Sequence, residues 1–274
     1  MDLPQIDTVI APRNRAELPP WQTGSAFLAG GTWIFSEPQP ALRSLVDLAG
    51  FGWPALEPSA AGLRIGATCT IAALEAFEAP ADWIAAPLFS QCAQSLLGSF
   101  KIWTMATVGG NVCLSLPAAP MVALTVALDG VACIWQPDGT ERSLRMAEFT
   151  TGPQQTALRH GEVLRAIDLP VAALRRRGAV RQASLTRHGR SAALLVATRD
   201  TTPNSDAGFT LTITAATQRP LHWRWAAPPD AATLDAQIAG LPDATWYDDV
   251  HGAPAWRRHM TRRLAAELLE ELGA

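Results

Sequence analysis

Two short glycine segments are the residues of this chain that most plainly suggest chemistry. The first is Leu28-Ala29-Gly30-Gly31-Thr32, which ends a strand-like run, and the second is Ala106-Thr107-Val108-Gly109-Gly110-Asn111, which lies in a long uncharged stretch. Glycines let successive backbone N–H groups converge on an anion, and a threonine hydroxyl adds a further donor. Both segments therefore indicate phosphate binding, although a glycine turn after a strand is also a common structural device.

The second segment strengthens the hypothesis because of its buried setting. A buried turn rich in backbone donors needs acceptors, which a pyrophosphate or a flavin ring edge would supply, unless neighbouring protein groups already do. Neither segment is the GxGxxG fingerprint followed by an acidic residue, so a Rossmann dinucleotide site is not indicated. The sequence predicts phosphates held by two separate loops.

Metal chemistry and side-chain catalysis have no support in the sequence. The four cysteines, Cys69, Cys92, Cys113 and Cys133, form no CxxC pair, and the five histidines show no ligand spacing. We therefore expect neither a metal site nor a catalytic acid, base or nucleophile in this chain.

The elements that must position the two segments fall into three lobes. Residues 1–57 contain strand-like runs at 25–29 and 45–48, which predict a small α/β lobe. Residues 58–177 predict a second, α+β lobe: a strand from Leu63, a helix capped by Thr70, and a helix over 87–97. The glycine turn at 107–111, a short helix beginning near Pro117 or Pro120, a strand over 131–135 and a hairpin turn at 137–139 follow.

Residues 178–274 predict a third lobe of strands backed by helices. Strands are expected around 192–198 and 209–217, with a loop at 200–208 between them. A closing helix begins near Pro254, because Trp256, Met260, Leu264 and Leu268 recur at four-residue spacing and give one apolar stripe.

The uncharged stretch at 102–128 is long enough to span a bilayer, but it does not read as a membrane helix. Gly109, Gly110, Asn111, Pro117 and Pro120 would break such a helix repeatedly and leave backbone groups unpaired in lipid. We expect a buried core segment instead.

Composition indicates a globular protein that does not bind nucleic acid. Charged residues make up 17% and hydrophobic ones 48% of 274 residues, and the formal net charge is −3. The N-terminus shows no secretory signal and the cysteines no disulfide pattern, so the predicted compartment is the cytoplasm. Exposed residues among Trp223, Trp225, Trp246 and Trp256 would indicate partner docking; the alternative is that these rings fill cores.

The order of the motifs resembles the FAD-binding subunit of molybdenum hydroxylases, the xanthine dehydrogenase and carbon monoxide dehydrogenase family. The resemblance begins with AGGT, LRIGAT and ATVGGN. It continues through Leu45-Val-Asp-Leu, the helix at 124–128, Gly161-Glu-Val-Leu with Asp168-Leu-Pro170, and Gly252-Ala-Pro-Ala-Trp-Arg-Arg, and so covers nearly the whole chain.

The resemblance implies an α+β fold: a two-lobed FAD-binding domain of the PCMH type, with subdomains at 1–57 and 58–177, and then a C-terminal α+β domain at 178–274 of the carbon monoxide dehydrogenase flavoprotein type. It implies noncovalent FAD between the first two lobes and partner subunits that carry molybdopterin and [2Fe–2S] clusters. Electrons would pass from those clusters through FAD to an acceptor such as NAD⁺ or oxygen.

The same resemblance maps the cofactor contacts onto this sequence. They are Leu28, Ala29, Gly30, Gly31, Thr32 and Trp33 in the first segment; Ile102, Thr107, Val108, Gly109, Gly110 and Asn111 around the second; and Leu164 and Arg181 near the isoalloxazine.

Departures from the family pattern keep two other functions open. Pro120 stands where many relatives place an aspartate that binds the FAD ribose, and Ile102-Trp103-Thr104 replaces a frequent Ile-Arg-Asn; Trp33 and Ser191 also depart. One alternative is a flavin-free scaffold subunit of the same complex. Another is a stand-alone flavin oxidoreductase, which would need a substrate pocket with a catalytic constellation of its own.

Overall fold

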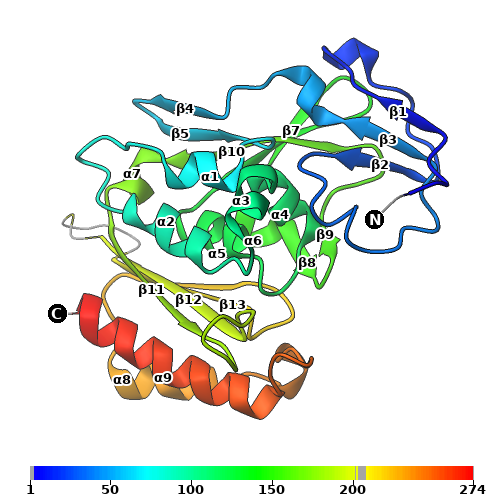
Figure 1. Cartoon of the computed structure of the whole chain (residues 1–274). Coiled ribbons are helices and arrows are strands. Elements are labelled where there is room, and N and C mark those ends of the chain that lie inside the picture. The colour runs from blue at the N-terminus through cyan, green and yellow to red at the C-terminus, as the bar shows by residue number, and fades with distance from the viewer. Residues whose placement is uncertain (1–2, 201, 203–207, 274) are drawn as a thin grey trace.

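The chain builds three main β-sheets in sequence order, and a layer of helices separates the second sheet from the third (Figure 1). The structure is a computed structural model that describes residues 3–200, 202 and 208–273. The α+β class predicted from the sequence is confirmed. Most of the predicted loop at 200–208 lies outside the described residues.

The first sheet contains three parallel strands in the order β1-β3-β2. They are β1 (Thr8–Ile10), β3 (Ser44–Asp47) and β2 (Ser25–Leu28), so both strands predicted in this lobe are confirmed. Two 3₁₀ turns, η1 (Arg15–Glu17) and η2 (Leu48–Phe51), flank them. Because β2 ends at Leu28, the chain turns into the first glycine segment at one edge of the sheet.

The second sheet has five antiparallel strands in the order β4-β5-β10-β6-β7. These are β4 (Leu56–Ser59), β5 (Gly62–Gly66), β10 (Val163–Pro170), β6 (Val131–Trp135) and β7 (Glu141–Arg145). The predicted hairpin turn is confirmed at Gly139, whose φ of 89° suits glycine. Between β7 and β10 the chain also forms a separate two-stranded hairpin, β8 (Thr150–Gly152) and β9 (Gln155–Thr156).

Short helices cover the inner face of the second sheet. They are α1 (Ile71–Glu75), α2 (Pro87–Gln94), α3 (Phe100–Met105), α4 (Val108–Leu114), α5 (Pro120–Ala127), α6 (Met146–Phe149) and α7 (Val171–Leu174). The Thr70 hydroxyl accepts a hydrogen bond from the Ala73 N–H at 3.1 Å, which confirms the predicted cap of α1. Helix α2 ends at Gln94, three residues earlier than predicted.

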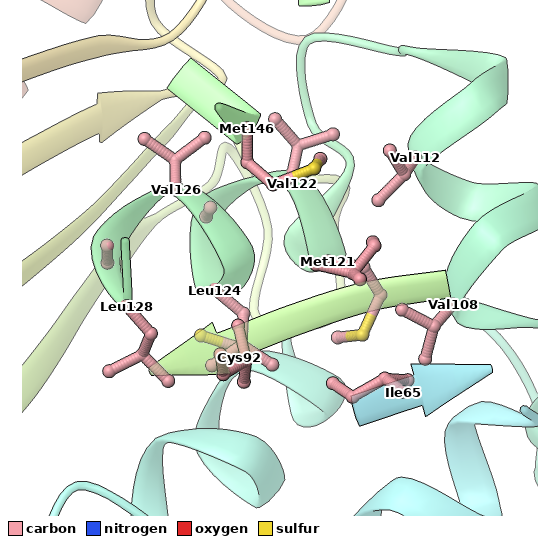
Figure 2. Packing of buried hydrophobic residues seen from close by; sticks show 14 of the residues in the cluster. Ile65, Cys92, Val108, Val112, Met121, Val122, Leu124, Val126, Leu128 and Met146 are labelled. Carbon is pink, nitrogen blue, oxygen red and sulfur yellow. The ribbon is translucent and has the colours of Figure 1, made fainter. Parts of the chain in front are cut away.

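Helix α5 is the buried centre of the molecule, with all eight of its residues enclosed. It packs against α2 and α4 on one side and against the third sheet on the other. Figure 2 shows Met121 and Leu124 directed toward Ile65 and Cys92. This enclosure explains the uncharged stretch, and no helix among the described residues is long and apolar enough to cross a membrane.

The third sheet is an antiparallel meander, β11 (Arg177–Ala183), β12 (Ala193–Arg199), β13 (Phe209–Thr214) and β14 (Leu221–Trp225). Helices α8 (Ala231–Ala239) and α9 (Pro254–Gly273) cover its outer face, with the turn η3 (Asp243–Thr245) between them (Figure 1). Side chains of β12 alternate: Leu194 and Val196 join the core around α5, while Leu195 packs with Leu264 and Leu268 of α9.

The predicted apolar stripe of the closing helix is confirmed, since Leu264 and Leu268 are buried and Trp256 and Met260 pack against the same core. The other tryptophans of this region also serve packing. Trp246 is 2% exposed, and Trp223 and Trp225 are partly buried against that core. The structure therefore favours core filling over partner docking for these rings.

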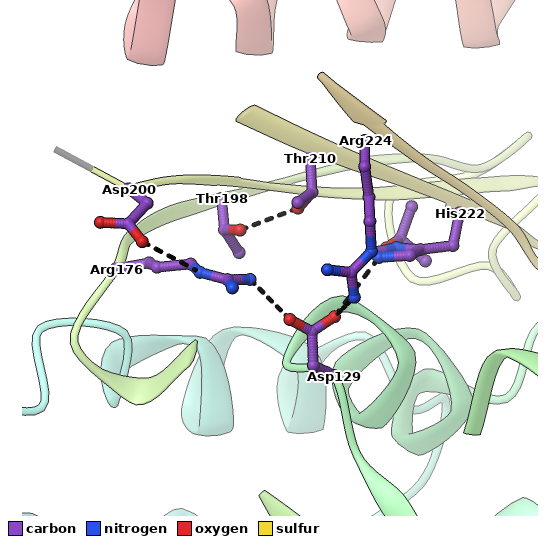
Figure 3. Close-up of polar contacts among 8 residues, drawn as sticks. Asp129, Arg176, Thr198, Asp200, Thr210, His222 and Arg224 are labelled. Atoms are coloured by element: carbon purple, nitrogen blue, oxygen red, sulfur yellow. Dashed lines mark hydrogen bonds and ion pairs between the residues drawn. The ribbon is translucent and has the colours of Figure 1, made fainter. Parts of the chain in front are cut away.

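A polar cluster ties the third sheet to the end of α5. Asp129 bonds to Arg176 at 2.8 Å and to Arg224, and its carboxylate lies 3.5 Å from Nε2 of His222 (Figure 3). The three sheets occupy residues 8–47, 56–170 and 177–225. We propose that they mark three structural units, whose boundaries lie close to the expected ones after residues 57 and 177, within the first residues of β4 and β11.

Candidate functional site

A cavity of about 630 Å³ opens between the first sheet, helix α4 and strand β10. Its volume is in the range of sites that bind cofactors and other small molecules. Its lining is mostly apolar and draws on segments that are far apart in the sequence. The lining residues are Trp21, 25–27, 29–34, Ser36, Leu48, Ala67, 95–97, Ile102, Ala106, Thr107, 109–111, Cys113, Leu114, Leu116, Ala118, Ala119, Leu158, 162–164 and Arg190.

The first glycine segment follows β2 and turns sharply along the cavity. Gly31 has a φ of 69°, a conformation that glycine adopts without strain. A Cβ placed on Gly30 would lie 1.8 Å from the carbonyl oxygen of Met105, so this residue must be glycine for the segment to rest on the end of α3. The backbone path of the segment therefore depends on both glycines.

The backbone donors of this first segment are available to a ligand. Within the part of the chain that the structure describes, the N–H groups of Gly30 to Ile34 donate to no protein acceptor. The hydroxyl of Thr32 likewise has no protein partner there. Half-buried N–H groups without acceptors are costly in an apolar setting, so this cluster fits an anionic group such as a pyrophosphate.

The second glycine segment is a helix start, which corrects the predicted turn at 107–111. Helix α4 begins at Val108, and the Thr107 hydroxyl caps it by accepting a hydrogen bond from the Gly110 N–H at 3.0 Å. Glycines are poor helix formers, but this cap and close packing outweigh that preference. A Cβ on Gly109 would lie 2.5 Å from the carbonyl oxygen of Ala67.

The donors of the second segment are already used within the protein. The N–H groups of Val108 and Gly109 donate to the carbonyls of Cys69 and Ala67, at 2.8 and 3.0 Å. The Asn111 N–H donates to the Thr107 carbonyl at 2.9 Å. Protein neighbours therefore satisfy the backbone donors of this segment, which still lines the cavity through Thr107 and 109–111.

Asn111 contacts the first turn of α5, which also contains Pro120. The Asn111 side-chain oxygen accepts a hydrogen bond from the Met121 N–H at 3.0 Å, which holds α4 against α5. Pro120 is buried in the first turn of α5 and is not part of the cavity lining, whereas Ala118 and Ala119 are. Where many relatives have an aspartate at the position of Pro120, the neighbouring cavity wall of this chain is therefore apolar.

The structure gathers most of the predicted site residues around the one cavity. The predicted residues that line it are Ala29, Gly30, Gly31, Thr32, Trp33, Ile102, Thr107, Gly109, Gly110, Asn111 and Leu164. Leu28 and Val108 lie beside the segments but outside the lining. Arg181 is also outside: it faces α9 and forms ion pairs with Glu267, at 3.4 Å, and with Glu271.

Several cavity residues escaped the sequence-based prediction. Phe27 of β2 and Trp21 line the cavity and contact each other with tilted rings, whose centroids are 4.9 Å apart. Cys113 follows Asn111 by two residues, and burial raises the pKa of its thiol to about 12, so it stays protonated. Arg190 comes from the third unit. Helical spacing from Asn111 could have indicated Leu114, but no local signal marks Arg190.

Glu162 is the acidic residue of the cavity lining, and its negative charge is balanced by an ion pair. Its side chain is 1% exposed and pairs with Arg142 at 2.6 Å, while the Arg159 N–H donates to it at 2.8 Å. The hydrogen bond from Arg142 is the main reason that the pKa of Glu162 is lowered. The carboxylate therefore stays ionised and tied to β7, and it does not act as a proton donor in the cavity.

A family model described as the FAD binding domain in molybdopterin dehydrogenase matches residues 14–172. The match covers more than half of the chain and includes both glycine segments. The chain therefore belongs to this family and is an FAD-binding subunit of the molybdenum hydroxylase type, an oxidoreductase family. The predicted cofactor, FAD, is confirmed at this level.

Individual relatives agree with the family assignment. XdhB of Escherichia coli (strain K12), named as a xanthine dehydrogenase FAD-binding subunit, is 33% identical over 108 residues. That region covers 39% of this chain and 36% of XdhB, so the match spans about a third of the relative.

Solved structures share the fold over the full length of the chain. Reconstituted CO dehydrogenase from Oligotropha carboxidovorans matches with a TM-score of 0.83 and 22% identity, covering 100% of this chain and 99% of that one. CO dehydrogenase from Hydrogenophaga pseudoflava, in a form that lacks the Mo-pyranopterin moiety of the molybdenum cofactor, matches with a TM-score of 0.83 and 19% identity, covering 99% and 98%. The PCMH-type domain and the C-terminal domain expected from the sequence are thus both present in the fold.

Proposed function

We propose that this chain is the electron-transfer subunit of a multi-subunit molybdenum hydroxylase, and that FAD bound in the cavity passes electrons to a terminal acceptor. The observation that carries the proposal is the row of N–H groups at Gly30 to Ile34, which have no acceptor among the described residues and face a mostly apolar cavity. Such a row binds a diphosphate, and the apolar walls accommodate aromatic rings.

The residues of the cavity would divide the work of holding the cofactor. The segment from Ala29 to Trp33 would bind the pyrophosphate through its N–H groups and the Thr32 hydroxyl. Gly109 and Gly110 would keep the wall thin enough for close approach, and Ile102 and Leu164 would contact the rings. FAD supplies the redox chemistry when bound, so the protein contributes position, exclusion of water and charge.

The proposed partners are a molybdopterin-binding large subunit and a small subunit with [2Fe–2S] clusters. The similarity in fold to CO dehydrogenases supports this assembly, since one of them is described as a form that lacks the Mo-pyranopterin moiety of its molybdenum cofactor. Substrate would be hydroxylated in the large subunit, and NAD⁺ or oxygen would accept the electrons here. The compartment would be the cytoplasm, since all four cysteines are free thiols.

Flavin content tests the cofactor assignment directly. Protein purified without added flavin should release one FAD per chain on denaturation, and the stripped chain should rebind FAD with quenching of flavin fluorescence. FMN, which lacks the second phosphate and the adenosine, should bind much more weakly. A colourless protein that neither releases nor rebinds FAD would support the scaffold alternative instead.

Co-purification tests the assembly. Affinity-tagged chain expressed from its native host should bring down a large molybdopterin-containing subunit and a small iron–sulfur subunit. Addition of the substrate of the large subunit should then bleach the flavin absorption. Isolation as a stable, FAD-loaded monomer that oxidises a substrate alone would contradict the complex and favour a stand-alone oxidoreductase.

A further inference from the structure

Two charged residues line the cavity, and Arg190 is the one whose charge is not paired with a protein group among the described residues. Glu162 is the other ionised residue of that lining, and Arg142 pairs with it at 2.6 Å. Arg190 is half-buried, and within the described residues it has no hydrogen-bond or ion-pair partner. A half-buried guanidinium that lacks an acceptor is poorly solvated and unpaired, which points to an anion supplied from outside the chain.

Nearby acidic groups do not account for Arg190. The residue follows Gly189 in the loop between β11 and β12 and also borders a smaller pocket that contains Asp249 and Arg257. Asp249 is bound there by Arg257, whose guanidinium is buried and also donates to the carbonyls of Gly252 and Ala192 at 2.7 and 2.8 Å. The carboxylate beside Arg190 is therefore already occupied.

Arg190 borders the cavity beside residues that follow the C-terminal end of α4, whereas the first segment lies near the N-terminal end of that helix. Arg190 shares both pockets with Leu116 and Ala118, which follow the end of α4. The start of α4 is close to the first segment, because a Cβ on Gly110 would lie 3.9 Å from the Cβ of Ala29. A seven-residue helix is about 10 Å long, so a comparable distance separates the two ends.

We propose that Arg190 contacts the isoalloxazine end of FAD and stabilises the negative charge that this ring acquires when it is reduced. The inference rests on the proposed function. If the first segment binds the pyrophosphate, the group about 10 Å away is either the adenine or the isoalloxazine ring. Adenine is neutral in both redox states. Arg190 would instead pair with the negative charge that a bound isoalloxazine would carry after gaining two electrons from the [2Fe–2S] clusters of the proposed partner and one proton from solvent.

The test is the midpoint potential of FAD bound to the full chain, measured by titration with dithionite against indicator dyes. Arg190→Gln removes the charge and should weaken the binding of reduced FAD about tenfold relative to oxidised FAD, which lowers the potential of this two-electron couple by about 30 mV. Arg190→Lys keeps the charge and should retain most of the potential. The affinity for oxidised FAD should change less than about threefold in both variants.

Arg187→Gln is the matched control, because Arg187 is an exposed arginine of the same loop that does not line the cavity. It should leave the potential unchanged. Equal shifts in Arg190→Gln and Arg187→Gln would overturn the proposal in favour of a long-range charge effect. Weaker binding of oxidised FAD and of ADP without a shift in potential would overturn it in favour of a phosphate contact. If the unaltered chain did not bind FAD, the proposed function itself would be refuted.

Discussion

The two glycine segments have similar sequences, but their backbone N–H groups differ in whether the protein supplies hydrogen-bond acceptors for them. In the first, the N–H groups of Gly30 to Ile34 have no acceptor among the described residues. In the second, the N–H groups of Val108 to Asn111 all donate to protein oxygens at distances from 2.8 to 3.0 Å. The first segment is therefore suited to bind a ligand, and the second is suited to pack helix α4 beneath it.

The glycines themselves do not reveal this difference, because packing requires glycine in both segments. A Cβ on Gly30 would lie 1.8 Å from the Met105 carbonyl oxygen, and one on Gly109 would lie 2.5 Å from that of Ala67. What separates the segments is the preceding residue. Thr107 is an N-cap and turns its segment into a helix, whereas Leu28 ends a strand and its segment turns along the cavity without forming a helix.

Gly30→Ala should have the largest effect, because it breaks the packing on which the binding segment depends. The backbone of Met105 cannot yield as a flexible side chain would, so we expect the free energy of unfolding to fall by more than about 3 kcal/mol. FAD binding should be lost as well. Urea denaturation and a fluorescence titration with FAD measure the two effects.

Gly139→Ala is the control for this change. A Cβ there meets no atom within 4 Å, and the φ of 89° adds only backbone strain. We expect a cost of about 1 kcal/mol and no change in FAD affinity. If Gly30→Ala were as mild as Gly139→Ala, the close contact between the first segment and α3 would be wrong.

Asp129→Asn should have the next largest effect and should alter stability without touching either segment. The carboxylate joins α5 to the third sheet through Arg176, Arg224 and His222 (Figure 3). Removing its charge leaves the buried Arg176 poorly paired, so we expect a loss of about 3 kcal/mol in the free energy of unfolding. FAD affinity should stay within about twofold of the unaltered chain, because the cluster lies outside the cavity lining.

The pH dependence of stability gives a second measure of the Asp129 cluster. Burial raises the pKa of Asp129, but the neighbouring His222 imidazole and the charges of Arg176 and Arg224 outweigh it, so the pKa lies below its ordinary value. The group therefore stabilises the fold above the unfolded-state pKa of about 4, and this contribution disappears as the pH falls through the folded-state pKa. Asp129→Asn should flatten that acid limb; an unchanged acid limb would contradict the assignment.

Strong local signals made much of the fold predictable from the sequence. The Thr70 cap, the hairpin at Gly139 and the four-residue spacing from Trp256 to Leu268 each specify one element, and the structure has all three. Both glycine segments were also identified, and most of the site residues predicted from the sequence line the cavity.

The predictions that differ from the structure depended on contacts distant in sequence. The turn at 107–111 became a helix because Ala67 and Cys69, some 40 residues earlier, accept its first N–H groups. Arg181 faces α9, since Glu267 and Glu271 lie across from β11. Arg190 reaches the cavity from a loop of the third unit. Such placements follow from the packing of the units, which no local pattern in the sequence encodes.

The matched pair Thr107→Val and Thr32→Val should give the smallest effects, and it separates the two segments most directly. Thr107→Val removes the cap of α4 and should lower the free energy of unfolding by about 1 kcal/mol while FAD affinity stays within about twofold. Thr32→Val removes a hydroxyl that has no partner in the described part of the chain, so it should leave stability unchanged and weaken FAD binding about fivefold. If Thr107→Val impaired FAD binding more than Thr32→Val, the second segment would be the main phosphate site, and the division between a binding segment and a packing segment would fail.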